Sequence, residues 1–550
     1  MSETKRWLTR TKFYSNQHSR SQSNRYIIVI STVILFLIST TGILLGALTN
    51  TNHANKSSKP VAAVPFKALS GTKANWVIAE NKKPGTTRWK ITTPQSPNGI
   101  MGYASRVQAR RGQKLNLYVS TQAPSFHIDA FRMGYYQGKG ARLVWKSNNL
   151  IGKKQPSCPV TPGINMVQCN WSSSLTLTIT KKWVQGQYLF KLIGSQGQQS
   201  YIPLTIWSPT SHAAYVIMSG VLTQQVFNPF GGYDLYQGAT PCAPGHYPCS
   251  SRSRVVSFDR PYATNYGNGS ASYLSLVYPL TRLAEKHGLN VTYWTDITLA
   301  RHGKLLSNHK VLISPGHDEE WSLHMRQAVV RAKKKGVNLI FFGASPILRK
   351  VRLQPSPLGP DRQIVNYRNP TKDPLYGKNN SQVTQNWWGQ PPANLPASTL
   401  VGAKYIGYNN TSQFPLVVSN SSSWFFRGTN LTNGSKIPSV LTTDFQEFSP
   451  TRPHNPPNIE ILAHSPVQVQ GHSGTYFADT TYYTTPSSKA GIFQSGSNSW
   501  IPSLIACPKN TKSCPAPTMR KITVNLLRVF GKGPVGITHP SKANWKQFYP

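Results

Sequence analysis

The hydrophobic period of this chain changes at about residue 210, and that change limits the possible folds more than any other feature. Between about residues 76 and 208 apolar and polar residues alternate, as they do around Leu115 and Leu117. Two such runs, 188–193 and 201–207, are joined by a glycine-containing turn and predict a hairpin. Many short strands separated by Gly and Pro predict an immunoglobulin-like β-sandwich over residues 76–208.

After residue 209, strand-like runs alternate with segments of helical period. The strand-like runs are 214–219, 290–295, 310–314 and 337–342, and the helical patterns cover 273–284 and 321–332. This alternation is typical of βαβ units in a parallel sheet. We therefore predict an α/β domain over residues 209–535, closed by a helix near 519–530 and followed by a tail at 536–550.

Residues 349–455 interrupt this pattern. They lose periodicity and are rich in Pro, Asn and Ser, which indicates an insertion of loops and short strands. An α/β fold often builds its site in such an insertion.

The N-terminal segment contains an apolar run, Ile27–Leu48, of 22 residues without a charge. A helix needs about 20 apolar residues to cross the hydrocarbon core, so we predict a transmembrane helix. Basic residues dominate 1–26, so the positive-inside rule places this tail in the cytoplasm. The bulk of the chain is then extracellular, behind a flexible stalk at 49–75, with the membrane as a partner. A cleaved signal peptide is the alternative.

All six cysteines follow the apolar run and fall into three sequence-local groups of two. They are Cys158 and Cys169, Cys242 and Cys249, and Cys507 and Cys514. Three short-range disulfides in an oxidising compartment are the natural interpretation, and they agree with an extracellular location. Six cysteines allow 15 connectivities, so the pairing itself is left open.

Acidic residues are scarce: 60 Lys and Arg stand against 16 Asp and Glu, which gives a formal net charge of +44. A surface of this kind favours anionic partners. The chain has no helix-turn-helix cue, no zinc-finger spacing and no clustered basic arm, so we do not expect nucleic acid. For an extracellular chain, anionic cell-wall polymers or an acidic milieu remain as explanations. The oligomeric state is left open.

Three of the 16 acidic residues are consecutive, Asp318-Glu319-Glu320, and follow Gly316-His317. The predicted strand 310–314 ends just before them, at the position where parallel sheets bind ligands. Carboxylates at the start of a helix can equally serve to cap its first turn. Signatures of serine hydrolases, zinc proteases, P-loops and dinucleotide sites are absent. The acidic cluster is therefore the strongest candidate site.

Six motifs occur in one order between about residues 90 and 530. They are 131–144 (FRMGYYQGKGARLV), 199–203 (QSYIP), 231–236 (GGYDLY), 256–262 (VSFDRPY), 316–321 (GHDEEW) and 474–483 with its TTYY. Together they make the chain resemble the family built around the large (beta) subunit of N,N-dimethylformamidase. The resemblance implies a β-sandwich followed by a glutamine-amidotransferase-like α/β domain.

The resemblance also implies chemistry, because the enzyme of that family hydrolyses a small tertiary amide with one iron held by two tyrosines and a glutamate. The matching motifs assign Glu319, Tyr236 and Tyr201 as ligands of Fe3+. They assign His317 as a catalytic histidine, and Glu460 lies where a further catalytic carboxylate is expected, so that either residue could move the proton. Phenolate and carboxylate oxygens are hard ligands suited to Fe3+. The metal would polarise an amide carbonyl and lower the pKa of a bound water.

Three positions depart from the family pattern, because Ser345 replaces an Asn, Glu320 replaces a Tyr and Arg368 replaces a Lys. The substrate is therefore open. Our leading hypothesis is a membrane-anchored extracellular hydrolase of C–N amide bonds other than peptide bonds. One alternative is a non-catalytic surface module that binds anionic wall polymer or glycan. Another is a glycan hydrolase that pairs Glu319 with Glu460.

Overall fold

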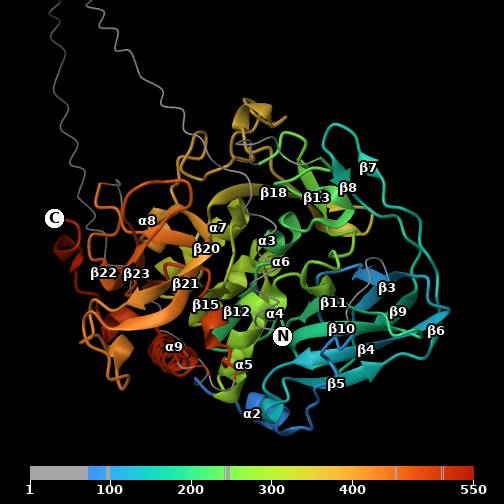
Figure 1. The fold of residues 1–550 in the computed structure, drawn as a ribbon, viewed down its shortest axis with the longest axis horizontal. Coiled ribbons are helices and arrows are strands. Elements are labelled where there is room, and N and C mark those ends of the chain that lie inside the picture. Colours follow the sequence, from blue (N-terminus) through green and yellow to red (C-terminus); the bar gives the residue numbers. More distant parts are fainter. Residues whose placement is uncertain are drawn as a thin grey trace, which may run out of the picture.

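The computed structural model describes residues 72–93, 99–240, 242, 248–451, 455–508, 511 and 513–550. They form a mixed α/β structure with strands in several sheets (Figure 1). The predicted cytoplasmic tail, the predicted transmembrane helix Ile27–Leu48 and almost all of the predicted stalk lie outside the described residues. Within the described part, no helix has the length and apolar character that a membrane span requires.

Two sheets between residues 100 and 206 pack face to face. One contains β1 (Ile100–Ala104), β3 (Lys114–Thr121) and β9 (Leu175–Thr178). The other contains β2 (Gln108–Ala109), β11 (Gln199–Ile206), β10 (Gly186–Gly194), β4 (Ser125–Met133) and β5 (Ala141–Lys146), with β6 (Leu150–Ile151) beside β4. Apolar residues of both sheets, among them Leu117, Ile128 and Phe190, form one buried core. The predicted hairpin is confirmed as β10 and β11.

A seven-stranded sheet forms the centre of the C-terminal part. Its strand order is β14 (Val291–Thr295), β12 (Tyr215–Ser219), β15 (Val311–Pro315), β17 (Asn338–Phe342), β24 (Gly491–Gln494), β23 (Tyr476–Thr484) and β22 (Glu460–Val467). The first five strands are parallel, and β23 runs antiparallel to both of its neighbours. The four predicted strands of the α/β pattern are confirmed, and all their residues are buried, as expected for parallel strands covered on both faces.

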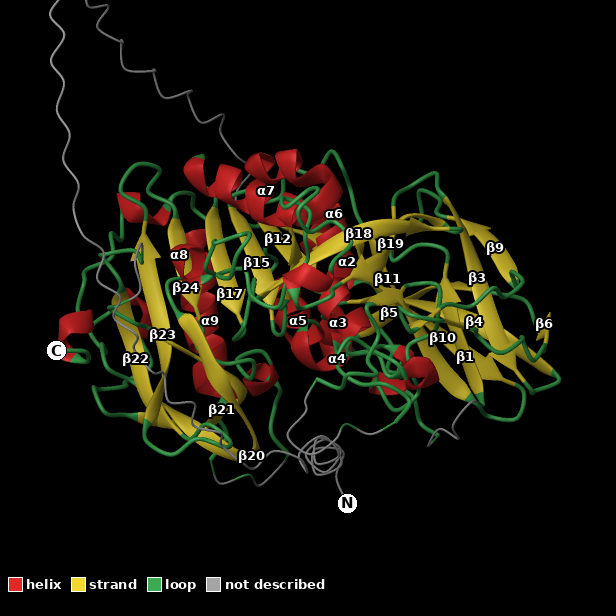
Figure 2. Ribbon diagram, turned by 90° about the horizontal axis from the view of Figure 1, so that it is seen from above, coloured by secondary structure: helices red, strands yellow, loops and turns green. Residues whose placement is uncertain are grey.

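Figure 2 shows α3, α4 and α5 between the seven-stranded sheet and the sandwich. The helices are α2 (Asn75–Lys82), α3 (Val221–Val226), α4 (Tyr273–Leu276), α5 (Tyr278–Lys286), α6 (Asp296–His302), α7 (Leu323–Lys334), α8 (Ser398–Val401) and α9 (Ala516–Phe530). The single helix predicted over 273–284 is two helices, because Pro279 has no N–H to donate within the helix. The helix predicted from Trp321 begins at Leu323, since the Ser322 hydroxyl caps it by accepting from Met325 N.

The insertion predicted at 349–455 contains longer strands than expected. In it, β18 (Arg349–Ser356) and β19 (Gly359–Val365) form a four-stranded sheet with β13 (Val255–Ser257) and β16 (Glu320–Ser322). The long strands β20 (Lys404–Val417) and β21 (Lys436–Glu447) form a hairpin, and elsewhere β7 (Val160–Thr161) pairs with β8 (Met166–Val167). Register shifts within β20 and β21, together with half-buried polar residues, hide the alternation by which a strand is normally predicted.

The three predicted sequence-local disulfides are confirmed. They join Cys158 to Cys169, Cys242 to Cys249, and Cys507 to Cys514, with sequence separations of 11, 7 and 7 residues. Each disulfide therefore closes a short loop and does not connect one sheet to another.

A buried ion pair joins the sandwich to the α/β part. Arg132 of β4 and Glu285 of α5 are both fully buried, with Nη2 2.6 Å from Oε1. Glu285 also accepts from the Tyr293 hydroxyl at 2.5 Å and from Asn81 Nδ2 at 2.9 Å. Arg132 donates in addition to Tyr136 Oη at 2.9 Å. Both charges have the hydrogen-bonded partners that buried ions need.

We predict that Arg132→Met lowers the free energy of unfolding by about 3–5 kcal/mol, because it leaves the Glu285 carboxylate buried without a counter-ion. Urea unfolding of the purified chain measures this change. The double variant Arg132→Met/Glu285→Gln removes the uncompensated charge and should recover part of the loss. Equal destabilisation of the single and double variants would contradict the argument.

The buried histidine His309 makes the stability of the fold depend on pH. It is 2 % exposed, and its Nδ1 lies 2.7 Å from the carbonyl oxygen of Ala213, so Nδ1 carries a hydrogen. Burial lowers the pKa of His309 to about 4. As the pH falls from about 6.5 to about 4, the unfolded chain binds a proton here that the folded chain does not bind, and stability is lost.

We predict that His309→Asn, which keeps a donor for Ala213, removes up to about 3 kcal/mol of this acid-dependent loss. Urea unfolding gives the free energy of unfolding of wild type and variant at about pH 7 and about pH 4.5. The loss between the two pH values in wild type, minus the loss in the variant, is the contribution of His309. The difference in free energy of unfolding between wild type and variant should be smaller at the lower pH. A difference that stays constant would mean that His309 does not titrate in this window.

Candidate functional site

The candidate site lies at the carboxyl end of β15. Gly316 follows this strand with φ +64°, and a Cβ placed here would come within 2.6 Å of Leu276 Cβ. Glycine is therefore required, both for its backbone conformation and for the space. The turn carries His317 and Glu319 to the edge at which parallel sheets bind ligands.

The side-chain hydroxyl of Thr223, in α3, holds this turn. Thr223, in the helix that follows β12, accepts from the backbone N–H of Glu319 at 2.8 Å and from that of Glu320 at 3.2 Å. Thr223 is 2 % exposed, so water does not replace these bonds. Thr223 was not among the predicted site residues, because a single threonine in a short helix carries no pattern that distinguishes it.

Three of the residues that were predicted to act together meet here: Tyr236, His317 and Glu319. Tyr236 Oη donates to Glu319 Oε2 at 2.8 Å, and His317 Nε2 lies 3.2 Å from the same oxygen. Arg349 Nε donates to the other oxygen, Glu319 Oε1, at 2.6 Å. The carboxylate of Glu319 is therefore engaged on both oxygens.

Aromatic and cationic groups surround the Tyr236 ring. Phe227 stacks on it with a centroid separation of 4.2 Å and an interplanar angle of 17°. The Arg368 guanidinium lies 4.1 Å from the ring centroid. Burial and the negative charge of Glu319 raise the pKa of Tyr236 well above its usual range, although Arg349 and Arg368 act in the other direction. The hydroxyl therefore keeps its proton and donates to Glu319 in this arrangement.

The two adjacent glutamates titrate in opposite directions. Burial disfavours the charge of Glu319, but Arg349 and His317 outweigh burial and hold its pKa at about 2. Burial raises the pKa of Glu320 to about 8, and the charge of Glu319 adds to this effect. Burial also disfavours a charged His317, yet Glu319 and Asp444 raise its pKa to about 9. At neutral pH Glu319 is thus a carboxylate, Glu320 a carboxylic acid and His317 an imidazolium.

The insertion contributes Asp444 of β21, which was not among the predicted site residues. Its Oδ2 lies 3.6 Å from His317 Nε2, and the side chains of His317 and Asp444 are 20 % and 17 % exposed. Asp444 accepts from Tyr405 Oη at 3.2 Å and from Asn498 Nδ2 at 2.6 Å. The solvent-facing side of the cluster therefore lies between His317 and Asp444. The scarcity of acidic residues was the one available signal, and it does not show that β21 reaches His317.

Glu460 and Glu319 lie at opposite ends of the strands of the sheet. Glu460 is the first residue of β22, whereas Glu319 follows the last residue of β15, and these two strands run in the same direction. Four strand spacings also separate the two strands, which is roughly 19 Å. The Glu460 carboxylate accepts from Asn420 Nδ2 at 2.9 Å and from Lys542 N at 3.1 Å. The structure does not bring the two glutamates to the separation of about 5–9.5 Å that a glycan hydrolase needs.

Tyr236 and Glu319 are the side chains that fit a hard metal ion. Their oxygens lie 2.8 Å apart and are donors of the type that Fe3+ prefers. Tyr201, the second predicted phenolate, lies in β11 and donates its hydroxyl to the carbonyl oxygen of Trp89 at 2.5 Å. Over the described ranges, no group of three or more His, Cys, Asp or Glu side chains is arranged to hold a metal. The cluster therefore offers two of the three predicted ligands.

The three departures from the family pattern are all buried. Glu320 Oε1 lies 3.3 Å from Tyr236 Oη, and Arg368 covers the ring of the same tyrosine. Ser345 donates to the carbonyl oxygen of Ala344 at 2.6 Å. Two of the departures thus change the surroundings of Tyr236, while the hydroxyl of Ser345 is used by its own backbone.

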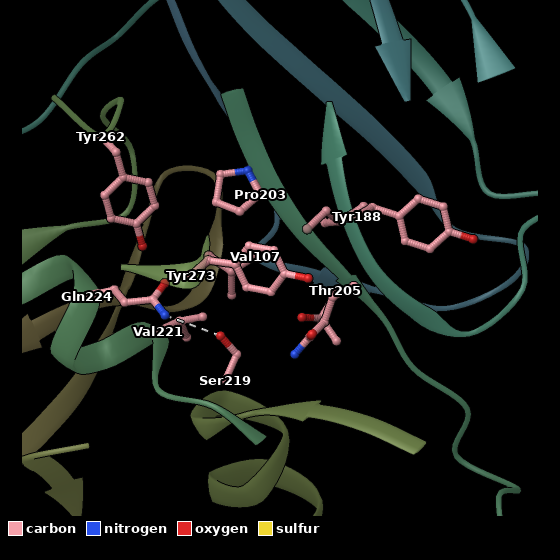
Figure 3. Close-up of a pocket in the computed structure, with 11 residues that line it drawn as sticks. Val107, Tyr188, Pro203, Thr205, Ser219, Val221, Gln224, Tyr262 and Tyr273 are labelled. Atoms are coloured by element: carbon pink, nitrogen blue, oxygen red, sulfur yellow. Dashed lines mark hydrogen bonds between the residues drawn. The ribbon is translucent and has the colours of Figure 1, made fainter. Parts of the chain in front are cut away.

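Figure 3 shows a small cavity between the sandwich and the seven-stranded sheet, and its volume is too small for a substrate. Ser219, the last residue of β12, is among its lining residues, and its volume of about 30 Å3 suits roughly one water molecule. Gln187 Nε2 and Tyr273 Oη belong to residues that line it, and neither atom has a hydrogen-bond partner among the described residues. Ordered water would satisfy both atoms.

We predict that Thr223→Val lowers the free energy of unfolding by roughly 2–4 kcal/mol, because it leaves two buried backbone N–H groups without an acceptor. The matched variant Thr223→Ser keeps the hydroxyl and should cost about 1 kcal/mol for one methyl group. Urea unfolding of the two variants measures the difference. An equal loss in both would show that the methyl group, and not the hydroxyl, holds the turn.

Comparison with known proteins adds a family match. A family model described as N,N-dimethylformamidase beta subunit-like, C-terminal, matches residues 127–513, well over half of the chain. No curated protein matches significantly. Of the solved structures, 26 chains match. One is the 1.4 Å crystal structure of an uncharacterized protein from Bacillus anthracis str. Ames, 9 % identical, covering 21 % of this chain and 97 % of its own, with a TM-score of 0.13, at which the likeness carries no argument.

Proposed function

The chain belongs to the N,N-dimethylformamidase beta subunit-like family, and on this premise we propose that it is a metal-dependent hydrolase of a C–N amide bond. The observation that carries the proposal is the meeting of Tyr236, His317 and Glu319 at the carboxyl edge of the parallel sheet. This cluster combines two hard oxygen donors with a group that can transfer a proton. A small amide is the proposed substrate class, and peptide bonds are not.

Tyr236 and Glu319 would hold the metal, for which we propose Fe3+. When bound, such an ion polarises an amide carbonyl and lowers the pKa of a water molecule. Arg349 neutralises the charge of Glu319, and Arg368 packs on the ring of Tyr236. These two arginines keep the buried cluster from accumulating negative charge when Tyr236 gives up its proton.

His317 is the proton-transfer group in this proposal. Its Nε2 lies near both Glu319 and Asp444, and its ring packs against Phe227 with a centroid separation of 5.0 Å. These contacts orient the imidazole, and its partial exposure leaves a side from which a substrate can approach. A proton at Nε2 can pass to the amine nitrogen as the C–N bond breaks, while water supplies the hydroxyl group of the acid product. Asp444 is a positioning residue in this scheme.

The proposal extends to location. Ile27–Leu48 would anchor the protein in the membrane, with residues 1–26 in the cytoplasm and the bulk outside. Its support is the uncharged apolar run behind a basic tail. The three disulfides also support it, because such bonds persist in oxidising compartments.

A non-catalytic surface module that binds anionic wall polymer or glycan is the second candidate function. The net charge of +44 favours it, since a strongly positive protein attracts anionic polymers. The two candidates differ in what Glu319 does, because binding of a polymer to the protein surface does not require a buried carboxylate.

We predict that the purified chain, supplied with iron, binds about one ion with a tyrosinate charge-transfer absorption, and that it releases amine from small N-alkyl amides. Glu319→Gln and Tyr236→Phe should each remove the absorption and lower amine release by about 100-fold or more, because each removes a ligand. Metal content, the visible spectrum and amine release are measured on the same samples.

The matched control is Glu460→Gln, the same chemical change at the opposite edge of the sheet, which should leave all three readouts within about twofold. A folded wild type that binds no iron would overturn the metal part of the proposal. A wild type that binds iron but releases no amine from any amide tested would overturn the hydrolase part and favour the surface module.

A further inference from the structure

A cleft with a volume of about 270 Å3 lies between the sandwich and the α/β part, away from Glu319 and Tyr236. Its walls are the segment around β2, the C-terminal end of α6 and the turn between β18 and β19. Arg362 of β19 spans this junction, because its guanidinium donates to the carbonyl oxygens of Ala104 at 3.0 Å and Ser105 at 2.8 Å. The two sides of the cleft are therefore held together by hydrogen bonds.

The cleft carries positive charge that the protein does not neutralise. Arg106 and Arg110, on either side of β2, are exposed and line the cleft. Within the ranges that the structure describes, neither guanidinium has an acceptor or a carboxylate partner. Arg301 of α6 also lines the cleft and pairs with Asp361 at 3.2 Å, while its side chain stays 43 % exposed. One carboxylate thus faces three exposed guanidiniums.

The remaining walls are partly apolar and include two packed rings. Trp207 is 5 % exposed, and its ring packs on that of His302 with a centroid separation of 4.8 Å. Burial and the positive charges of Arg301 and Arg110 lower the pKa of His302. A cleft of about 270 Å3 is slightly smaller than the usual range of about 300–1,000 Å3 for ligand pockets. It suits one small charged unit with a few attached carbons.

We propose that this cleft is an anion site that binds a phosphate group, as one unit of a phosphate-bearing polymer. The three guanidiniums reach the cleft from three segments of the chain, after β1, after β2 and from α6. A tetrahedral phosphate can accept hydrogen bonds from three directions, whereas a planar carboxylate has two oxygens that lie in one plane. The site is separate from the cluster at Glu319 and does not depend on the proposed hydrolase activity.

The test compares two double variants of the full-length chain by calorimetric titration with short-chain inorganic polyphosphate. Arg106→Gln/Arg110→Gln removes the two unpartnered charges of the cleft. Lys181→Gln/Lys182→Gln is the matched control, because it removes two exposed positive charges from the turn that follows β9. We expect at least a tenfold loss of affinity in the first variant and a change within about twofold in the second.

A third variant gains binding. Asp361→Asn releases Arg301 from its carboxylate and should tighten polyphosphate binding about threefold or more. The same titrations with polygalacturonate test a carboxylate polymer. Polygalacturonate should bind more weakly than polyphosphate, and its affinities for the two double variants should differ less. Metal content and amine release should stay at the wild-type level in all these variants.

Four outcomes would overturn the proposal. If the wild type does not bind polyphosphate, the cleft is not the proposed anion site. Equal losses in the two double variants would mean a diffuse attraction to a positive surface. Weaker binding by Asp361→Asn would contradict the role of Arg301. Polygalacturonate that binds as tightly as polyphosphate, with the same loss in Arg106→Gln/Arg110→Gln, would overturn the choice of phosphate.

Discussion

The buried pair of Arg132 and Glu285 is the contact on which the arrangement of the two halves depends. Removing two charges from water costs several kcal/mol per ion, so such a pair persists only when hydrogen bonds satisfy the charges. Those bonds come from four elements, because Asn81 lies in α2 and Tyr293 in β14, in addition to β4 and α5. Movement of α5 against β4 would break the two hydrogen bonds between Arg132 and Glu285 at once. The small cavity and the cleft are lined by residues of both halves, so they too lie at this junction.

The candidate site uses charge differently, because one guanidinium decides which of two neighbouring acids is ionised. Glu319 and Glu320 are both almost completely buried. Arg349 lies against Glu319 at 2.6 Å, so Glu319 carries the charge and disfavours a second charge on Glu320. The exposed edge, formed by His317 and Asp444, is where protons can be exchanged with solvent. The buried side of the cluster therefore carries the charge of Glu319, and the exposed side can transfer protons.

The parts that the sequence predicted well are those with a strong local signal. The parallel strands are continuous apolar runs, and the β10–β11 hairpin alternates clearly, so both were predicted close to their true bounds. The meeting of Tyr236 with Glu319 followed from the family motifs together with the position of Glu319 at a strand end.

The parts that were missed depend on contacts between distant segments. The β20–β21 hairpin was not predicted, because its register shifts break the alternation, and with it Asp444 was lost from the predicted site. The position of Glu460 depends on strand direction, since the reversal through β23 places the start of β22 at the amino edge. Thr223 acts through a hydroxyl directed at two backbone amides, a role that composition and spacing do not reveal.

The short spans of the three disulfides bear on how this protein reaches its native state. With sequence separations of 7 to 11 between partners, each bond restricts the unfolded chain modestly, by about 2–3 kcal/mol in the loop-entropy description. None of them crosses from one sheet to another, so burial of apolar side chains can assemble the scaffold before any thiol is oxidised. Disulfide formation would then follow folding and protect surface turns from proteolysis. Reducing agents should loosen those turns without unfolding the rest of the protein.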